Sequence, residues 1–309
     1  MTTKVLKFGG TSLADADQFK KVRSIVESDP SRRFVVASAP GKRFDSDIKV
    51  TDLLYDCYDK ATRSESFEDT LSEIAGRFNG IISALGVDFD IDPDIDLIRR
   101  NLSNYPSRSY AASRGEYLNS KILAAYLGYN FVDPYYCIKF TSDGRLDPNA
   151  TNTALTLRLS GLENAVIAGF YGSGPDGNII TFSRGGSDIT GSLVARAIGA
   201  DLYENWTDVS GLLAADPRII ENPRVVEYIS YRELRTLSYM GATVLHADAL
   251  LPVNHAGIPV NIKNTNHPED PGTMIVSELP HSAPGQEASE GVRGKKDLAR
   301  CTDCWPLPV

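Results

Sequence analysis

Short, mostly apolar runs rich in β-branched residues alternate with stretches of helical periodicity along most of this chain. Such runs occupy residues 5–8, 34–37 and 165–170, and residues 50–127 carry helical patterns between them. Apolar runs of this length are typical of strands that are buried on both faces of a sheet. Strands that alternate with helices form a mainly parallel sheet with helices on both sides. We therefore expect an α/β fold, specifically a three-layer α/β/α sandwich.

Composition narrows the possible classes of protein. The chain has 309 residues, 42% of them hydrophobic, a formal net charge of −8 and four cysteines. An acidic chain is a poor candidate for nucleic-acid binding, which needs a basic face. No apolar run reaches the roughly 18 residues of a spanning helix, and four cysteines in a chain of this length do not make a disulfide scaffold. We expect a cytoplasmic protein that binds neither nucleic acid nor membranes.

The first motif is Lys7-Phe-Gly-Gly-Thr-Ser12, a strand that runs into a glycine turn before a helix. Gly9 and Gly10 would let the backbone approach a polyphosphate closely, and amides at a helix start point towards an anion. Lys7 adds a positive charge there. Taken alone, two adjacent glycines are more often part of an ordinary strand–turn–helix connection, where they serve the geometry of the turn. The spacing matches neither a P-loop nor a dinucleotide-binding turn.

A second glycine turn lies in Thr181-Phe-Ser-Arg-Gly-Gly-Ser-Asp188, again between a strand and a helix. Facing the first turn, it would enclose a phosphoryl group from two sides. Arg184 can grip a carboxylate or phosphate with two parallel hydrogen bonds, and Asp188 could orient Lys7. Alternatively, Asp188 only complements the helix dipole and Arg184 is a surface residue.

Two further motifs add candidate ligand-binding residues. Glu116, in Ser113-Arg-Gly-Glu116, could accept hydrogen bonds from a substrate ammonium group, although many such glutamates only complement a helix dipole. Thr207 and Asp208, in the stretch 206–218, suit a ribose and a base edge, and Arg218 suits phosphates. The alternative for this stretch is a turn built on Asp216-Pro217.

The four motifs occur in the order seen in aspartate kinases, and the chain resembles this family from residue 3 to about residue 276. The resemblance implies the amino acid kinase (carbamate kinase-like) fold. It also implies transfer of the ATP γ-phosphoryl group to the β-carboxylate of L-aspartate, the first step of lysine, threonine and methionine biosynthesis. The alternatives are a glutamate, acetylglutamate, carbamate or uridylate kinase, or an inactive or regulatory fragment.

The resemblance also implies roles for individual residues. Lys7 and Asp188 would be catalytic, and Lys7, Gly9 and Gly10 would contact the phosphates. The aspartate site would comprise Thr51, Glu116, Arg184, Gly185, Gly186 and Ser187. The nucleotide site would add Thr207, Asp208, Leu213 and Arg218. Two departures weaken the expected ATP contacts: Thr243 stands where many relatives have a lysine, and Leu213 where they often have a tyrosine.

No general base is expected, because an aspartate side chain has a reference pKa near 3.9 and is ionised at neutral pH. Magnesium would accompany ATP and be held mainly by phosphates rather than by a protein site. The four histidines are expected to be structural or exposed.

The catalytic unit would span residues 1–276, with an aspartate-binding lobe at 1–150 and a nucleotide-binding lobe at 151–276. Residues 277–309 read as an atypical tail without the complete ACT domain that aspartate kinases usually carry. A homodimer, weakened by that lack, is the expected assembly. Within the catalytic unit, residues 130–140 look extended, and Pro175-Asp-Gly-Asn178 predicts a hairpin turn.

Overall fold

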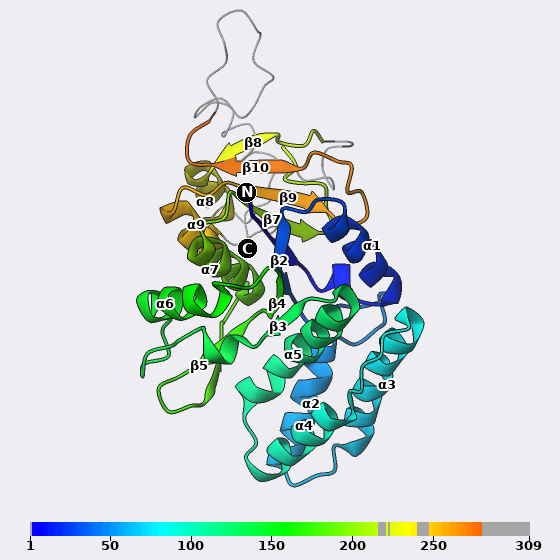
Figure 1. The fold of residues 1–309 in the computed structure, drawn as a ribbon. Helices are drawn as coiled ribbons and strands as arrows, with labels where there is room; N and C mark the ends of the chain where they lie inside the picture. The colour runs from blue at the N-terminus through cyan, green and yellow to red at the C-terminus, as the bar shows by residue number, and fades with distance from the viewer. Residues whose placement is uncertain (1, 216–220, 222, 240–246, 280–309) are drawn as a thin grey trace, which may run out of the picture.

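One central sheet organises the fold in the computed structural model, which describes residues 2–215, 221, 223–239 and 247–279. Its strands follow the order β3-β4-β2-β1-β7-β9-β10-β8 (Figure 1). Neighbouring strands are parallel except β9 and β10, which confirms the mainly parallel sheet. The strands are β1 (Lys4–Phe8), β2 (Arg32–Ala37), β3 (Asn130–Val132), β4 (Ala165–Ala168), β7 (Leu202–Thr207), β8 (Tyr228–Ser230), β9 (Val260–Asn264) and β10 (Thr273–Val276).

Helices fill most of the remaining described chain. The α-helices are α1 (Ala16–Glu27), α2 (Val50–Thr62), α3 (Glu68–Leu85), α4 (Asp92–Asn104), α5 (Arg108–Leu127), α6 (Pro148–Leu159), α7 (Gly186–Ile198), α8 (Tyr231–Tyr239) and α9 (Leu251–His255). Three short 3₁₀ turns are η1 (Thr11–Leu13), η2 (Pro134–Tyr136) and η3 (Ala247–Leu250). None of the helices in the described ranges is long and apolar enough to cross a membrane.

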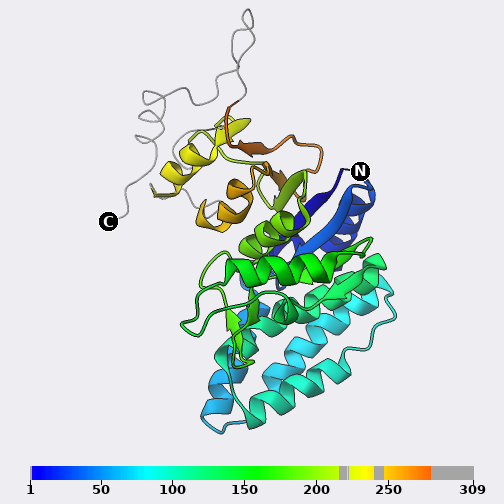
Figure 2. The same cartoon turned by 60° about the vertical axis from the view of Figure 1, so that its left-hand side comes forward.

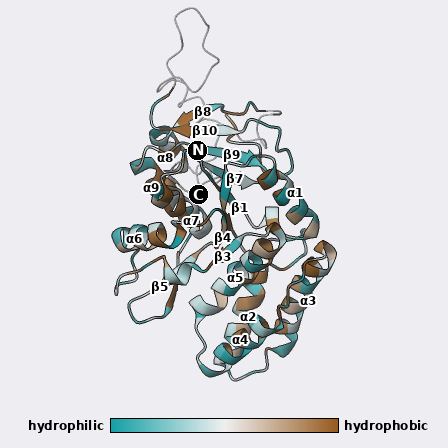
Figure 3. Cartoon of the chain, viewed as in Figure 1, coloured by the Kyte–Doolittle hydropathy of each residue, from teal (hydrophilic) through white to brown (hydrophobic). Residues whose placement is uncertain are grey.

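The sheet separates two apolar cores, as a three-layer sandwich requires. Along β1, Leu6 and Phe8 pack in one core with α1 to α5, whereas Val5 packs in the other with α6, α7 and α9. This split follows from the alternation of strand side chains between the two faces. Two views show α2 to α5 grouped on one side of the sheet (Figures 1 and 2), and hydrophilic residues lie mainly on loops and outer helix surfaces (Figure 3).

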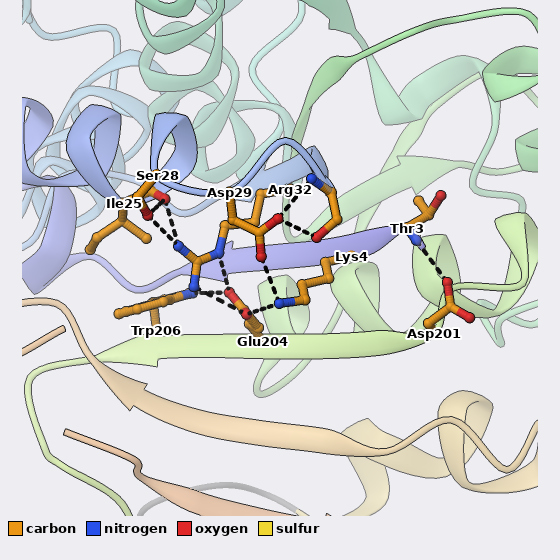
Figure 4. A network of polar contacts seen from close by, with 10 residues as sticks. Thr3, Lys4, Ile25, Ser28, Asp29, Arg32, Asp201, Glu204 and Trp206 are labelled. Atoms are coloured by element: carbon orange, nitrogen blue, oxygen red, sulfur yellow. Dashed lines mark hydrogen bonds and ion pairs between the residues drawn. The ribbon is translucent and has the colours of Figure 1, made fainter. Parts of the chain in front are cut away.

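A cluster of charged side chains joins β1, β2 and β7 near the start of β1 (Figure 4). The buried carboxylate of Glu204 accepts hydrogen bonds from Arg32 Nε at 2.9 Å and from Trp206 Nε1 at 2.9 Å. Lys4 Nζ lies 3.5 Å from the same carboxylate and 2.8 Å from Asp29 Oδ2. These contacts connect three strands that lie far apart in the sequence.

Two local expectations had different outcomes. The hairpin is confirmed, because β5 (Tyr171–Ser173) and β6 (Ile179–Thr181) pair as antiparallel strands around the predicted turn. The extended stretch at 130–140 is wrong beyond β3, since η2 follows directly. Pro134 opens that turn, and the Asp133 carboxylate accepts the Tyr135 N–H, so the chain turns before a longer strand can form. Residues 280–309, most of the expected tail, lie outside the described residues.

Candidate active site

The candidate site lies at the carboxyl edge of the sheet, beyond the ends of β1, β2, β4 and β7. From β1 the chain crosses through α1 to β2 on one side, while β7 pairs with β1 on the other side after α7. Helices α1 and α7 belong to opposite layers. Open α/β sheets bind ligands outside the carboxyl ends of their strands at such a change of direction.

Three polar side chains, those of Lys7, Asn205 and Asp188, contact one another near this edge. Lys7 and Asn205 are register partners on β1 and β7, so both side chains point to the face that α7 covers. Lys7 Nζ lies 2.7 Å from Asp188 Oδ1, and Asn205 Nδ2 donates to the same oxygen at 2.8 Å. Lys7 is 9% exposed. The ammonium group is therefore held next to the first glycine turn by a carboxylate from the start of α7.

The first glycine turn is closed by backbone contacts, and at Gly10 and Gly41 these contacts require glycine. Gly9 N–H donates to the carbonyl of Trp206 at 3.0 Å, and Gly41 N–H donates to the carbonyl of Gly10 at 2.8 Å. A Cβ on Gly10 would lie 2.9 Å from the Ala39 carbonyl oxygen, and one on Gly41 would lie 2.6 Å from the carbonyl carbon of Gly10. The turn after β1 and the loop after β2 thus touch through their backbones.

The second glycine turn leads into α7 as expected. Gly185 is the N-cap residue of this helix with φ of 57°, a left-handed conformation that glycine adopts without strain. A Cβ on Gly186 would lie 2.6 Å from the ring of Phe170, so this position also needs glycine. Arg184 precedes the helix and is exposed, and Ser187 is buried in its first turn. The N-terminus of α7 therefore follows the arginine and brings Asp188 to Lys7.

Phe170 is a site neighbour that the sequence analysis did not identify. It has φ of 82°, which is rare for a residue with a side chain, and it connects β4 to β5. Its N–H donates to Thr190 Oγ1 at 3.1 Å, and that hydroxyl donates to the Gly186 carbonyl at 2.9 Å. Strain of this kind persists only where the surroundings impose it, and it is frequent at functional sites. The sequence carries no signal for it, since phenylalanine does not favour this conformation.

Glu116 reaches the site from the middle of α5. Its carboxylate lies by the backbone of Ala39, and Oε2 is buried without a hydrogen-bond partner among the described residues. Burial raises the pKa of Glu116 to about 8, because the low-dielectric surroundings disfavour the ionised form. Gly115 makes this approach possible, since a Cβ there would lie 2.8 Å from Ala39 Cβ. The acid is thus ready to accept a hydrogen-bond donor or a positive charge.

The family model for the amino acid kinase family matches residues 2–264. This chain belongs to the amino acid kinase family. Aspartokinase 3 of Bacillus subtilis is 41% identical to it over 291 residues, which are 89% of this chain and 64% of that protein. The resemblance to aspartate kinases found in the sequence is thereby confirmed.

Solved structures agree with the family. The aspartate kinase of Clostridium acetobutylicum is similar with a TM-score of 0.86 and 48% identity, covering 91% of this chain and 64% of that one. E. coli aspartokinase III in complex with aspartate and ADP is similar with a TM-score of 0.78 and 26% identity, covering 90% of this chain and 65% of that one. This amino acid kinase chain therefore spans just under two thirds of the length of these relatives.

The other candidate residues of this amino acid kinase belong to the start of α2 and to the end of β7 and the segment after it. Thr51 stands half-buried in the first turn of α2, while Thr207 ends β7 and bonds the exposed Asp208 through their side chains at 3.2 Å. Leu213 is half-buried and pairs with Val225. Arg218 and Thr243 lie outside the described residues, so the structure gives neither of them a place.

Histidine and metal-ligating side chains are sparse in the described parts of this amino acid kinase. His255 and His267 are exposed, as expected, whereas His246 and His281 lie outside those parts. No group of three or more His, Cys, Asp or Glu side chains that could hold a metal ion occurs among the described residues.

Asn205 is the other residue that the sequence analysis missed. It shares Asp188 Oδ1 with Lys7 and is 3% exposed. A signal for it exists, because a polar residue in a strand that both layers cover needs a partner.

Proposed function

We propose that this chain is the catalytic part of an aspartate kinase. It would transfer the γ-phosphoryl group of ATP to the β-carboxylate of L-aspartate and release 4-phospho-L-aspartate and ADP. The observation that carries the proposal is the Lys7–Asp188 contact of 2.7 Å between the two glycine turns. The similarity to E. coli aspartokinase III, solved with aspartate and ADP, supports this choice of substrates.

The proposed reaction requires the substrates to be positioned and the charge on the phosphoryl group to be neutralised, and it requires no general base. The attacking carboxylate is already ionised at neutral pH. Charge then develops on the transferring phosphoryl group, and fixed donors aimed at it lower the barrier. Lys7, oriented by Asp188, and the amide of Gly10 would be the donors of this site. The Gly9 N–H is bonded to the Trp206 carbonyl, so Gly9 would only let the phosphates approach closely. Magnesium, carried by the phosphates and water, would neutralise further charge when ATP is bound.

Recognition of aspartate would use both of its remaining charged groups. The ammonium group would bind Oε2 of Glu116, which has no hydrogen-bond partner in the part of the chain that the structure describes. Arg184, exposed at the mouth of the second turn, would bind the α-carboxylate with two parallel hydrogen bonds. Thr51 and Ser187 lie in the first turns of α2 and α7, where they would add hydroxyl contacts. Gly185 and Gly186 would let the substrate approach the start of α7.

The nucleotide would bind at the end of β7. Thr207 and Asp208 at the end of β7 would contact the ribose and the base, with Leu213 beside them. Arg218 would contact phosphates. The expected lobes at 1–150 and 151–276, a homodimer and a place in lysine, threonine and methionine biosynthesis remain predictions.

A hydroxamate assay tests the proposed reaction directly. Hydroxylamine traps an acyl phosphate as a coloured hydroxamate, so the purified chain with magnesium-ATP should give colour with aspartate and none with glutamate. ADP release with glutamate, acetylglutamate, carbamate or UMP but not with aspartate would assign another member of the family. No turnover with any of these substrates would identify an inactive fragment.

A further inference from the structure

The loop after β2, residues 38–49, connects the two proposed substrate sites. Near its start, the carbonyl of Ser38 accepts a hydrogen bond from Asn119 of α5 at 2.7 Å, and Ala39 lies by the carboxylate of Glu116 on the same helix. Gly41 N–H donates to the carbonyl of Gly10 at 2.8 Å, so the loop contacts the first glycine turn. The loop then leads directly into α2, whose first turn holds Thr51. The position of this loop therefore affects both the phosphate turn and the aspartate site.

One arginine from α3 lies inside this loop. Arg77 NH1 donates to the carbonyl of Ile48 at 2.7 Å, and NH2 donates to the carbonyl of Gly41. NH2 also lies 3.3 Å from Asp47 Oδ2. A single guanidinium group thus contacts both ends of the segment 41–48. A lysine could not reproduce this arrangement, because its ammonium lacks the planar fork of donors.

Arg77 occupies a position where the helix pattern calls for an apolar residue. It lies on the buried face of α3 with Ile74, Phe78 and Ile81, and it is 8% exposed. Its Nε has no hydrogen-bond partner among the described residues. Burying a charge is costly unless it is paired and hydrogen-bonded. An apolar residue would suit the helix–helix packing at lower cost, so the benefit of arginine lies in the loop.

The carboxylate that faces Arg77 is itself fixed. Asp47 is 8% exposed and accepts the backbone N–H of Arg43 at 2.9 Å and its NH2 at 2.7 Å. The hydrogen bonds from Arg43 hold the pKa of Asp47 below its usual range, so Asp47 stays ionised. Arg43 contacts this carboxylate and the ring of Phe44, which lies 5.4 Å from its guanidinium carbon, whereas Arg77 holds the two carbonyls.

We propose that Arg77 is a positioning residue for phosphoryl transfer. Its guanidinium group holds the segment 41–48 so that Gly10 stays in place for the phosphates and Thr51 for aspartate. This role rests on the proposed function of those two residues. Because misplacement of a reacting group by about 1 Å can cost roughly 100-fold in rate, release of this loop has a kinetic effect at both sites.

Three variants and two readouts test the proposal. Arg77→Gln removes the charge and the fork, Arg77→Lys keeps only the charge, and Arg43→Gln is the matched control that leaves both carbonyls bonded to Arg77. Chymotrypsin cleavage after Phe44, which is 58% exposed in this loop, reports on the loop without requiring any activity. Steady-state kinetics give KM for ATP, KM for aspartate and kcat. Circular dichroism and thermal melts show whether each variant folds.

For Arg77→Gln we expect cleavage after Phe44 to accelerate about tenfold, and we expect kcat to fall and both KM values to rise about tenfold or more, by the sensitivity of rate to position. Arg77→Lys should lie between it and the wild type, and the KM values of Arg43→Gln should stay within about threefold of the wild type on the same grounds. Wild-type cleavage and KM values in a folded Arg77→Gln would overturn the proposal. If Arg77→Gln does not fold, wild-type values in Arg77→Lys would overturn it. If the wild type does not phosphorylate aspartate, the proposed function fails, and unchanged cleavage would separately overturn the loop role.

Discussion

Two clusters of charged side chains lie on the same pair of strands, β1 and β7, and they are completed differently. In the first, Glu204 is 2% exposed and accepts hydrogen bonds from Arg32 and Trp206, with Lys4 also close to it (Figure 4). All its charges are matched within the protein. It lies on the α1 face of the sheet near the start of β1, among packed side chains.

The second cluster lies on the opposite face at the other end of the same strands. Lys7 and Asn205 share one oxygen of Asp188 there, beside two glycine turns and the start of α7. Lys7 keeps further donor capacity at the edge where helix and turn amides point outward. The comparison shows that similar residues can be fully paired within the protein or left with free hydrogen-bonding capacity at the carboxyl edge. The second arrangement supports the proposal that Lys7 binds a ligand.

The largest effect is expected for Lys7→Ala. Loss of the charge should lower kcat about 100- to 1,000-fold, because a fixed donor to the developing charge is removed. The fold should survive, since Asn205 still bonds Asp188. The hydroxamate assay and a thermal melt measure both quantities. A kcat close to the wild-type value would remove Lys7 from the mechanism and make the two clusters equivalent.

Glu204→Gln should have the opposite effect to Lys7→Ala: it should lower stability and leave kcat unchanged. It leaves Arg32 without a charged partner in a largely buried place, which costs about 3–5 kcal/mol of unfolding free energy, while Lys4 keeps its ion pair with Asp29. The kcat of the folded fraction should not change. Urea unfolding measures the loss, and Glu27→Gln, in an exposed pair with Arg23, is the control. A loss as small as that of the control would show that the first cluster is not structural.

Arg184→Lys should raise KM for aspartate about tenfold, because a point charge replaces a fork that binds a carboxylate with two hydrogen bonds. KM for ATP should stay near its wild-type value. Initial-rate kinetics with each substrate varied in turn give both constants. An unchanged KM for aspartate would place Arg184 outside the aspartate site.

Glu116, a buried acid at the proposed aspartate site, should make aspartate binding depend on pH. Burial raises the pKa of Glu116 to about 8, so its carboxyl is protonated at neutral pH in the free protein. Only the ionised form attracts an ammonium group, hence KM for aspartate should fall about tenfold or more between pH 6.5 and 8.5.

Whereas aspartate binding should strengthen as the pH rises, the stability of the free protein should decrease. The folded pKa of Glu116 lies above its unfolded value. The contribution of Glu116 to the free energy of unfolding is therefore fully present below pH 4.5 and is lost as the pH rises through about 8. Glu116→Gln should remove both trends. A pH-independent KM in the wild type would contradict the ammonium role of Glu116.

The smallest effect is expected for Lys4→Met. Lys4 pairs with Asp29 where both side chains are partly exposed, so its removal should cost about 1 kcal/mol or less. Activity should remain at the wild-type level, because Arg32 still satisfies Glu204. Urea unfolding and the hydroxamate assay check this. Lost activity would show that the first cluster acts on the site.

Much of the fold could be predicted because its signals are local. The apolar runs that became β1, β2 and β4 needed no knowledge of their neighbours, and both glycine turns lie between a strand and a helix as expected. The prediction of an extended segment after β3 was wrong because a single proline and the Asp133 cap outweigh strand propensity there. Asn205 was missed because its importance depends on Asp188, which only the register of β1 and β7 brings to it.

The sequence by itself determined the layers, the strand–turn–helix units and the family, because periodicity and motif order are properties of the chain. Only the tertiary structure decided which charges are matched. Whether Lys4 and Lys7 are structural or available depends on their face of the sheet and on partners from β7 and α7. Likewise, the raised pKa of Glu116 and the loop that Arg77 holds come from burial and from contacts between distant segments, which no local pattern encodes.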